Sequence, residues 1–262
     1  MCVIKNLTAW LLMLVAAMTV KHHFSGADPA DLAWILAPTA ALVEGVTGLV
    51  FAPDLALGYV CPQAQVIIAP ACSGINFLII AFGVTAIAGL ARFRSLRAKA
   101  AWLIASAAIG YGATLAANTG RIVTAIWLDN ADFYSAWASA DSAHRMLGIL
   151  IYLPGLYLIH HLAQRLVHTL APVAVCCTQR PRVFPNPLPL IVYGVVLLLV
   201  PLLNDAGRIA DPLFISHALA VMGGALFIYA LIAGIRLSFF MIGRRTSRQL
   251  SHIAKPAGKL AW

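Results

Sequence analysis

The chain has 262 residues, of which 61% are hydrophobic and only 10% are charged, and its mean hydropathy is +0.88. A soluble domain carries about 25% charged residues. These values exclude a soluble protein and predict an all-α, polytopic helical membrane protein. The apolar runs lack the period-2 alternation of an outer-membrane barrel. The net charge of +9 is explained by loops that face anionic lipid, so it gives no indication of a nucleic-acid partner.

The basic and acidic residues occupy different segments. The loop 92–99, the Pro-rich loop 165–182 and the tail from 236 onward hold, with Lys5, 14 of the 18 basic residues. Eight of the nine acidic residues lie elsewhere: Asp28, Asp31, Asp54, Asp129, Asp132, Asp141, Asp205 and Asp211. The positive-inside rule therefore places the basic segments in the cytoplasm and the acidic segments outside.

This charge distribution predicts about six crossings with both termini inside. The outward helices are expected near 6–21, 100–120 (extending as far as Trp127) and 188–204. The inward helices are expected near 72–91, 144–162 and 213–236. Lys5 precedes the first apolar run, so a cleaved signal peptide is the alternative to a retained first helix, but no convincing small-x-small cleavage site follows.

The segment 31–51 does not fit as a simple crossing, because it would turn the basic loop 92–99 outward. It also contains Pro38, Glu44, Gly45 and Gly48. We expect a broken or re-entrant pair of half-helices, with Glu44 directed into protein. An ordinary tilted helix, with a seventh crossing elsewhere, is the alternative.

The whole chain, 1–262, is expected to form a single integral-membrane domain. Its core, 60–165, contains the residues with chemical potential. A helix pair, 188–236, follows, and a basic cytoplasmic tail, 237–262, ends the chain. No cysteine and histidine spacing typical of a metal site occurs, and no cofactor is predicted.

Three reactive residues are expected at one membrane depth. Cys72 follows Pro70 at the outer start of an inward helix, where the helix N-terminus favours a thiolate. Arg121 lies about 22 residues after Lys99, roughly 33 Å along a helix, so it returns to the outer boundary. His144 opens the next inward helix at the same boundary.

These residue types suit nucleophilic catalysis. His144 can take the thiol proton of Cys72 and later protonate a leaving amine. Arg121 can stabilise the thiolate or the oxyanion of a tetrahedral intermediate. Taken singly, each residue has a simpler interpretation. Cys72 would be a small buried hydrophobe, Arg121 an arginine that reaches lipid phosphate, and His144 a solvated helix-cap histidine. The catalytic hypothesis rests on their coincidence at one depth.

Three short motifs resemble those of the exosortases and archaeosortases. "ACSGINFL" (71–78) resembles the nucleophile motif, "NTGRI" (118–122) the Asn-x-x-Arg motif, and "HRMLG" (144–148) the motif of a histidine followed by glycine. The resemblance covers about 60–165, and the first 60 residues look most like the short K-type exosortases (exosortase K). It assigns Cys72 as nucleophile and makes Arg121 and His144 essential. Asn118 belongs to the second motif, and Ser73 and Asn76 flank the nucleophile as supporting residues.

The resemblance implies a membrane-embedded cysteine protease or transpeptidase. Its partners would be exported proteins with a C-terminal sorting signal, which consists of a short motif, a transmembrane helix and a basic end. They would be cleaved through a Cys thioester, with the acyl group passed to a surface acceptor. It also implies the bacterial cytoplasmic (inner) membrane, with the active site at the outer, periplasmic face.

Several residues leave alternatives open. Arg208 and His217 echo the second and third motifs without a second cysteine; we interpret them mainly as interfacial residues, with substrate contact as the alternative. A Cys61–Cys72 disulfide is chemically feasible but would block the nucleophile. The rival function is a multi-pass transporter or channel, with 31–51 as its broken helix and Glu44 as an ion-coupling carboxylate. A catalytically inert assembly protein is a third reading.

Overall fold

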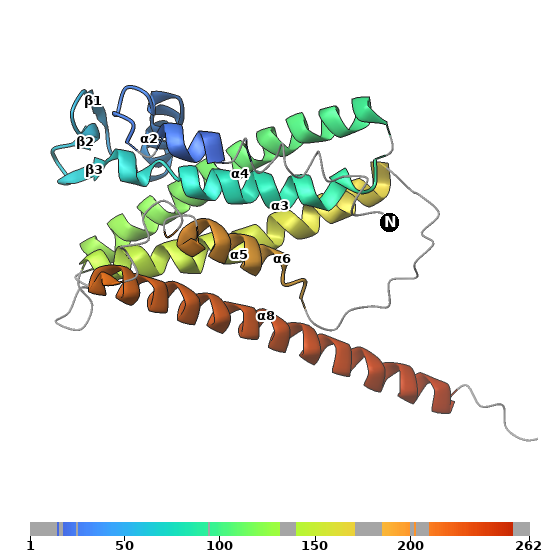
Figure 1. Cartoon of the computed structure of the whole chain (residues 1–262). Helices are drawn as coiled ribbons and strands as arrows, with labels where there is room; N and C mark the ends of the chain where they lie inside the picture. The colour runs from blue at the N-terminus through green and yellow to red at the C-terminus, as the bar shows by residue number, and fades with distance from the viewer. Residues whose placement is uncertain are drawn as a thin grey trace, which may run out of the picture.

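Long helices dominate the described part of the chain (Figure 1). The computed structural model describes residues 15, 18–24, 26–93, 95–131, 140–170, 185–199, 202 and 210–253, without side chains at 140–145, 213, 239–240 and 242–253. The long helices are α3 (Ile75–Leu90), α4 (Leu96–Asn130), α5 (Ala140–Leu170) and α8 (Pro212–Ile253). The predicted helical membrane fold is therefore confirmed.

The expected number of six crossings is not confirmed. Within the described residues, four segments are long and apolar enough to cross a membrane: Pro70–Leu90, Leu96–Asn130, Met146–Leu170 and Phe214–Ser238. The first expected helix, 6–21, lies largely outside the described residues. Of the helix expected near 188–204, the described residues form α6 (Leu188–Gly194) and a π-helical turn, η3 (Val195–Leu199), an apolar stretch that is shorter than a span over its described part.

The expected broken pair of half-helices at 31–51 is wrong. This segment forms one continuous helix, α2 (Ala33–Thr47), which ends at Gly48 with φ +73°. Pro38 lies inside α2, where it has no N–H to donate to the carbonyl of Trp34. The hydroxyl of Tyr111 on α4 donates to that carbonyl instead, at 2.8 Å, so the neighbouring helix satisfies the group that proline leaves open.

Glu44 also has a structural partner. Its carboxylate accepts a hydrogen bond from the backbone N–H of Phe51 at 2.7 Å, which holds the turn after α2. The expectation that Glu44 is directed into protein is consistent with this contact. An anchored carboxylate does not favour the ion-coupling role of the transporter reading.

A small antiparallel sheet follows α2 and adds strands to a fold expected to be all-α. Its order is β1 (Ala52–Asp54), β2 (Gly58–Cys61) and β3 (Val66–Ile68). Asp54 closes the first turn by accepting from the backbone N–H groups of Leu57 and Ala56, and these bonds lower the pKa of its carboxyl group. Figure 1 shows the sheet and α2 together at the end of the molecule where α3 begins.

Glycines allow the helices to approach one another closely. A Cβ on Gly89 would lie 2.4 Å from the indole nitrogen of Trp102, which donates to carbonyl oxygens of α3. A Cβ on Gly224 would lie 3.0 Å from Ile149, so this glycine brings α8 against α5. Gly89 and Gly224 therefore allow close helix contacts, whereas a Cβ on Gly223 would meet no atom within 4 Å.

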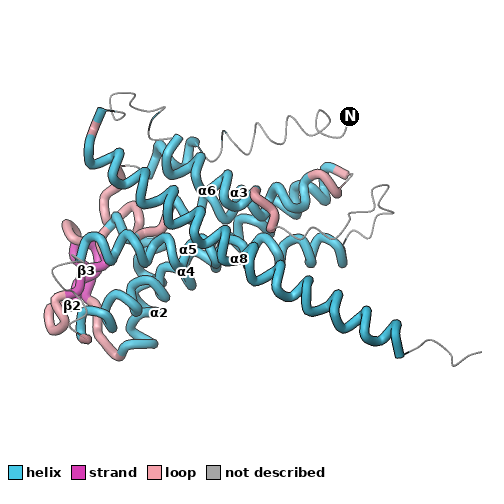
Figure 2. Tube along the Cα trace, turned by 90° about the horizontal axis from the view of Figure 1, so that it is seen from below, coloured by secondary structure: helices cyan, strands magenta, loops and turns pink. Residues whose placement is uncertain are grey.

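The two ends of the helix bundle differ in character. At one end, Arg92 after α3 is hydrogen-bonded to His168 of α5 at 2.9 Å. At the other end lie the sheet, the start of α3 and the start of α5 (Figure 1). Cys72 therefore lies at the end of the bundle away from the basic loop, as its place in the sequence predicts. Seen from below, α8 continues well past the other helices (Figure 2).

Candidate active site

Cys72 lies in a tight turn that enters α3. Pro70 begins a 3-10 turn, η2 (Pro70–Cys72), and Cys72 ends it. Gly74, with φ +72°, is the N-cap of α3. Cys72 therefore precedes the α-helix, rather than occupying its first turn as expected. Its thiol is free, and the residue is partly exposed.

A chain of hydrogen bonds joins the nucleophile turn to Arg121. Asn118 Nδ2 on α4 donates to the carbonyl oxygen of Cys72 at 2.5 Å. The hydroxyl of Tyr152 on α5 donates to Asn118 Oδ1. Arg121 Nη1 donates to that hydroxyl at 3.0 Å, and the guanidinium carbon lies 5.5 Å from the centre of the Tyr152 ring. Asn118 thus connects the first two motifs directly, and Tyr152 of α5 joins Asn118 to Arg121.

Two motif glycines border this arrangement, and Gly74 makes it sterically feasible. A Cβ on Gly74 would lie 2.9 Å from Asn118 Nδ2 and 3.0 Å from a methyl group of Thr114. The positive φ also disfavours any other residue at this position. Gly148 on α5 packs against Arg121, since a Cβ there would lie 3.8 Å from Arg121 Nε. The glycines of the first and third motifs therefore face side chains of the second.

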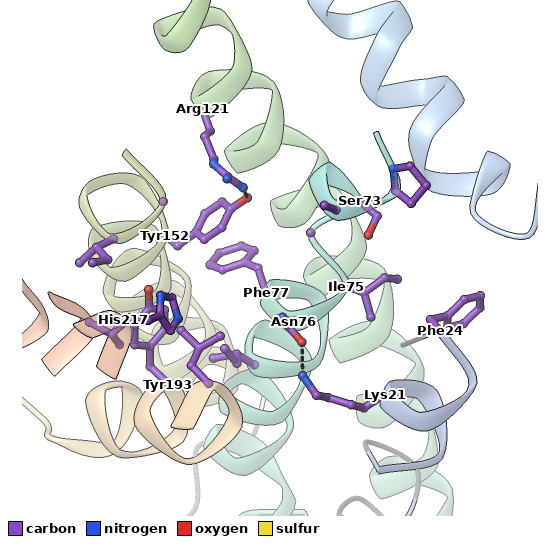
Figure 3. Close-up of a pocket in the computed structure, with 18 of the residues that line it drawn as sticks. Lys21, Phe24, Ser73, Ile75, Asn76, Phe77, Arg121, Tyr152, Tyr193 and His217 are labelled. Atoms are coloured by element: carbon purple, nitrogen blue, oxygen red, sulfur yellow. Dashed lines mark hydrogen bonds between the residues drawn. The ribbon is translucent and has the colours of Figure 1, made fainter. Parts of the chain in front are cut away.

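The turn borders a cavity of about 790 Å³, within the usual range of ligand sites of about 300–1,000 Å³. Figure 3 shows Ser73, Arg121, Tyr152 and His217 around it. Cys72 itself is not part of the described lining, although its neighbours Ala71 and Ser73 are. The described lining includes the cationic Lys21 and Arg121 but no carboxylate, so an electron-rich group is favoured inside. The cavity lining is drawn from many elements: the segment 18–24, η2, α3, α4, α5, α6, η3 and α8.

The supporting residues near the nucleophile have distinct surroundings. Ser73 is buried and lines the cavity. Asn76 is exposed, and its side-chain oxygen accepts a hydrogen bond from Lys21 Nζ at 2.6 Å (Figure 3). This contact ties the segment before α2 to the first turn of α3.

The structure brings Cys72, Asn118 and Arg121 together, but it describes His144 only by its backbone. His144 belongs to α5 and lies one turn before Gly148, which contacts Arg121. Its side chain lies outside the described residues. Its helix position is therefore established, whereas its contact with Cys72 stays a prediction.

Sequence reasoning missed Tyr152 and undervalued His217. Tyr152 follows His144 and Gly148 at successive intervals of four residues, the spacing of one helix face. That interval was the available indication, but a tyrosine in an apolar run is also typical of ordinary helix packing. His217 of α8 lines the cavity, whereas Arg208 lies outside the described residues.

The remaining candidate groups do not extend the site. Cys61 is fully buried in β2 and is a free thiol, so the Cys61–Cys72 disulfide is absent. Cys2, Cys176 and Cys177 lie outside the described residues. In the part of the chain that is described, no group of three or more His, Cys, Asp or Glu residues could hold a metal ion.

The site and the bundle agree with a known family. A family model described as transmembrane exosortase (Exosortase_EpsH) matches residues 3–161, which include all three motifs. The chain belongs to the transmembrane exosortase family. As a member of that family with four long apolar helices, it is an integral membrane protein. The comparisons with curated proteins and with solved structures returned no match.

The exosortase match ends within α5. The helices α6 and α8 follow the matched residues, yet both contribute residues to the cavity.

Proposed function

We propose that this exosortase is a cysteine peptidase and transpeptidase that cleaves C-terminal sorting signals. The observation that carries the proposal is the hydrogen-bond chain from the Cys72 carbonyl through Asn118 and Tyr152 to Arg121, beside a cavity of about 790 Å³. These contacts fix the turn that carries the Cys72 thiol next to the cavity.

In the proposed reaction, the Cys72 thiolate attacks the carbonyl carbon of the scissile peptide bond. A carbon–sulfur bond forms, and Arg121 stabilises the negative charge on the carbonyl oxygen. The carbon–nitrogen bond then breaks, and the leaving amine takes a proton from the imidazolium of His144. A thioester remains on Cys72.

The second half of the reaction restores the enzyme. An acceptor hydroxyl, amine or water loses a proton to neutral His144 and attacks the thioester carbonyl. The carbon–sulfur bond breaks, and the thiolate of Cys72 departs. His144 is left as the imidazolium, ready for the next cycle. Hydrolysis and transfer thus differ only in the acceptor.

Asn118 and Tyr152 act as positioning residues in this proposal. The turn Pro70–Cys72 enters α3 through Gly74, so contacts from α4 and α5 can set the direction of Cys72. Asn118 donates a hydrogen bond to the carbonyl of Cys72, and Tyr152 orients Asn118 by donating to its side-chain oxygen. Arg121 has five N–H donors, and its bond to Tyr152 uses one of them.

The substrate would be an exported protein that ends in a short motif, a transmembrane helix and a basic segment. Anchoring enzyme and substrate in one bilayer orients the scissile bond and removes part of the entropy cost of encounter. We place the enzyme in the bacterial inner membrane, with Cys72 at the periplasmic face, and assign it to the K-type exosortases. The charge distribution of the loops supports the orientation, and the resemblance of the first 60 residues supports the K-type assignment.

Co-expression tests the function. A protein with such a C-terminal end, encoded beside this chain, should yield a shorter form when the wild-type enzyme is present. The shorter form should be absent with Cys72→Ala at equal enzyme levels. Processing that continues with Cys72→Ala, at an unchanged cleavage site, would rule out the mechanism.

A further inference from the structure

His217 lies on the face of α8 that packs against the rest of the bundle. Val221, Ala225 and Ile228 are all at most 3% exposed and follow His217 at intervals of four, eight and eleven residues, which is one helix face. Gly224, on the same face, makes the close contact with Ile149 of α5. This contact holds α8 against α5 only two turns after His217, so His217 is directed into the cavity instead of lipid.

The wall built by α6, η3 and α8 is apolar except near His217. Its cavity-lining members include Leu197, Ala220 and Val221, with Ser216 and His217 as the polar members that α8 contributes. Figure 3 shows His217 beside Tyr193 on this side of the cavity, with Lys21 and Phe24 on the opposite side. Because His217 lines the cavity, its imidazole is within reach of a polar group of whatever the cavity holds.

An extended polypeptide supplies such groups. Each peptide group carries a strong N–H donor and a C=O acceptor that must be paired when water is excluded. A neutral imidazole offers one donor and one acceptor, which matches a peptide group. The walls formed by Leu197, Ala220 and Val221 cannot supply either function.

We propose that His217 is a substrate-binding residue that hydrogen-bonds the main chain of the polypeptide held in the cavity. The inference rests on the proposed function, because it takes the cavity beside Cys72 as the substrate site. His217 belongs to α8, which follows the residues matched by the family model. The C-terminal helices thereby add a binding wall to a catalytic core located in α3, α4 and α5.

Two alkylating probes test this without knowledge of the sorting motif. The probes are N-acetyl-alanyl-alanyl chloromethyl ketone, which has a peptide backbone, and chloroacetamide, which does not. With either probe, the Cys72 thiolate attacks the methylene carbon, a sulfur–carbon bond forms, and chloride leaves. Mass spectrometry of peptides from the purified full chain reports the rate at Cys72, and buried Cys61 serves as an internal reference.

We expect saturable alkylation of Cys72 by the peptide probe. His217→Leu should raise the concentration for half-maximal rate by about three- to tenfold, the effect of losing one hydrogen bond. His217→Gln should retain most of the wild-type value, because an amide also donates and accepts. Neither variant should change the rate with chloroacetamide. Leu219→Ala, on the exposed side of α8, is the matched control and should match the wild type.

The outcomes separate the two proposals. If the wild-type Cys72 shows no saturable reaction with the peptide probe, the proposed function fails and this inference fails with it. If saturation is normal but His217→Leu leaves it unchanged, only the inference is overturned. A fall in the maximal rate that is as large in His217→Gln as in His217→Leu would also overturn it, since that pattern indicates proton transfer. Size-exclusion profiles and melting temperatures of the variants establish that each protein is folded.

Discussion

The side-chain amide of Asn118 donates a hydrogen bond to the carbonyl oxygen of Cys72, 46 residues earlier in the chain. This contact connects the second helix of the core to the turn that carries the thiol. It acts on the main chain, so it sets the direction of the turn without touching sulfur. Variants of its partners can therefore change catalysis while leaving the nucleophile in place.

Tyr152→Phe removes one hydroxyl from this chain of hydrogen bonds. We expect processing to fall by about tenfold or more, because losing a partner leaves a buried polar group unsatisfied at a cost of about 1–3 kcal/mol. Initial rates in membranes with matched enzyme levels measure the effect. Tyr111→Phe is the control, because it also loses one tyrosine hydrogen bond from an interhelical contact, here the bond from α4 to the main-chain carbonyl of Trp34 on α2. Equal losses in both variants would contradict a positioning role for Tyr152.

Gly74→Ala should abolish processing and lower stability. The new Cβ would lie 2.9 Å from Asn118 Nδ2, and the φ of +72° costs a further 1–2 kcal/mol or so for alanine. Gly112→Ala in α4 is the control, because no atom lies within 4 Å of its added Cβ. A helical glycine replaced by alanine should be neutral or slightly stabilising. Thermal unfolding in detergent measures both, and a Gly74→Ala protein with normal processing would refute the packing argument.

Cys72→Ala should eliminate processing while the protein remains folded. Cys72→Ser should also be nearly inactive, because a hydroxyl is far less acidic than a thiol. Cys61→Ala should remain active, since Cys61 is buried in β2 and has no chemical role. Immunoblots of a co-expressed substrate measure the ratio of processed to intact form. Activity in the Cys72→Ser variant equal to that of the wild type would argue against thiolate chemistry.

Arg121→Ala and His144→Ala should each reduce processing to background. The first variant removes the stabiliser of the oxyanion, and the second removes the proton donor to the leaving amine. Arg208→Ala should retain measurable processing, because no catalytic role is assigned to it. Rates at equal protein levels provide the comparison. Loss in Arg208→Ala together with tolerance of Arg121→Ala would mean that the essential arginine has been misassigned.

The helices were predictable because length and hydropathy determine them, whereas the small sheet was not. α3, α4 and α5 occupy the apolar runs between polar loops. The strands β1–β3 have only three or four residues, which is too short for a clear alternating pattern. Their β-branched residues, near Val60 and Ile67, lie in a segment for which the sequence analysis predicts no helix or strand.

The site was partly predictable for the same reason. Counting residues between loops predicts that Cys72 and Arg121 reach one level, and the structure connects them through Asn118 and Tyr152. The connecting tyrosine was not predicted, because helix spacing identifies a face but not the atoms it contacts. His217 was undervalued since packing of α8 against α5 depends on Gly224, a contact that hydropathy does not reveal.

Membrane orientation remains a prediction with a direct measurement. Leu55, which is 91% exposed after β1, should face outward, and Leu96, which is 85% exposed at the start of α4, should face the cytoplasm. Each is replaced by cysteine in a Cys72→Ser background and treated with a membrane-impermeant maleimide on intact cells. Only Leu55→Cys should be labelled, because the basic loop before Leu96 is retained inside. Labelling of Leu96→Cys from outside would invert the proposed topology.

The length of α8 sets the distance between Arg236 and His217, and so the depth of His217 in the membrane. Arg236 follows His217 by nineteen residues, which is about 28 Å along a helix and close to the roughly 30 Å of a hydrocarbon layer. If Arg236 is anchored among cytoplasmic headgroups, His217 is held at the opposite boundary of the same layer. Removing four residues between these two positions would shorten the distance from Arg236 to His217 by about 6 Å and rotate the helix only slightly. The binding wall and the nucleophile would then stand at different heights, so the enzyme would cut at a displaced position or stop cutting in membranes of normal thickness.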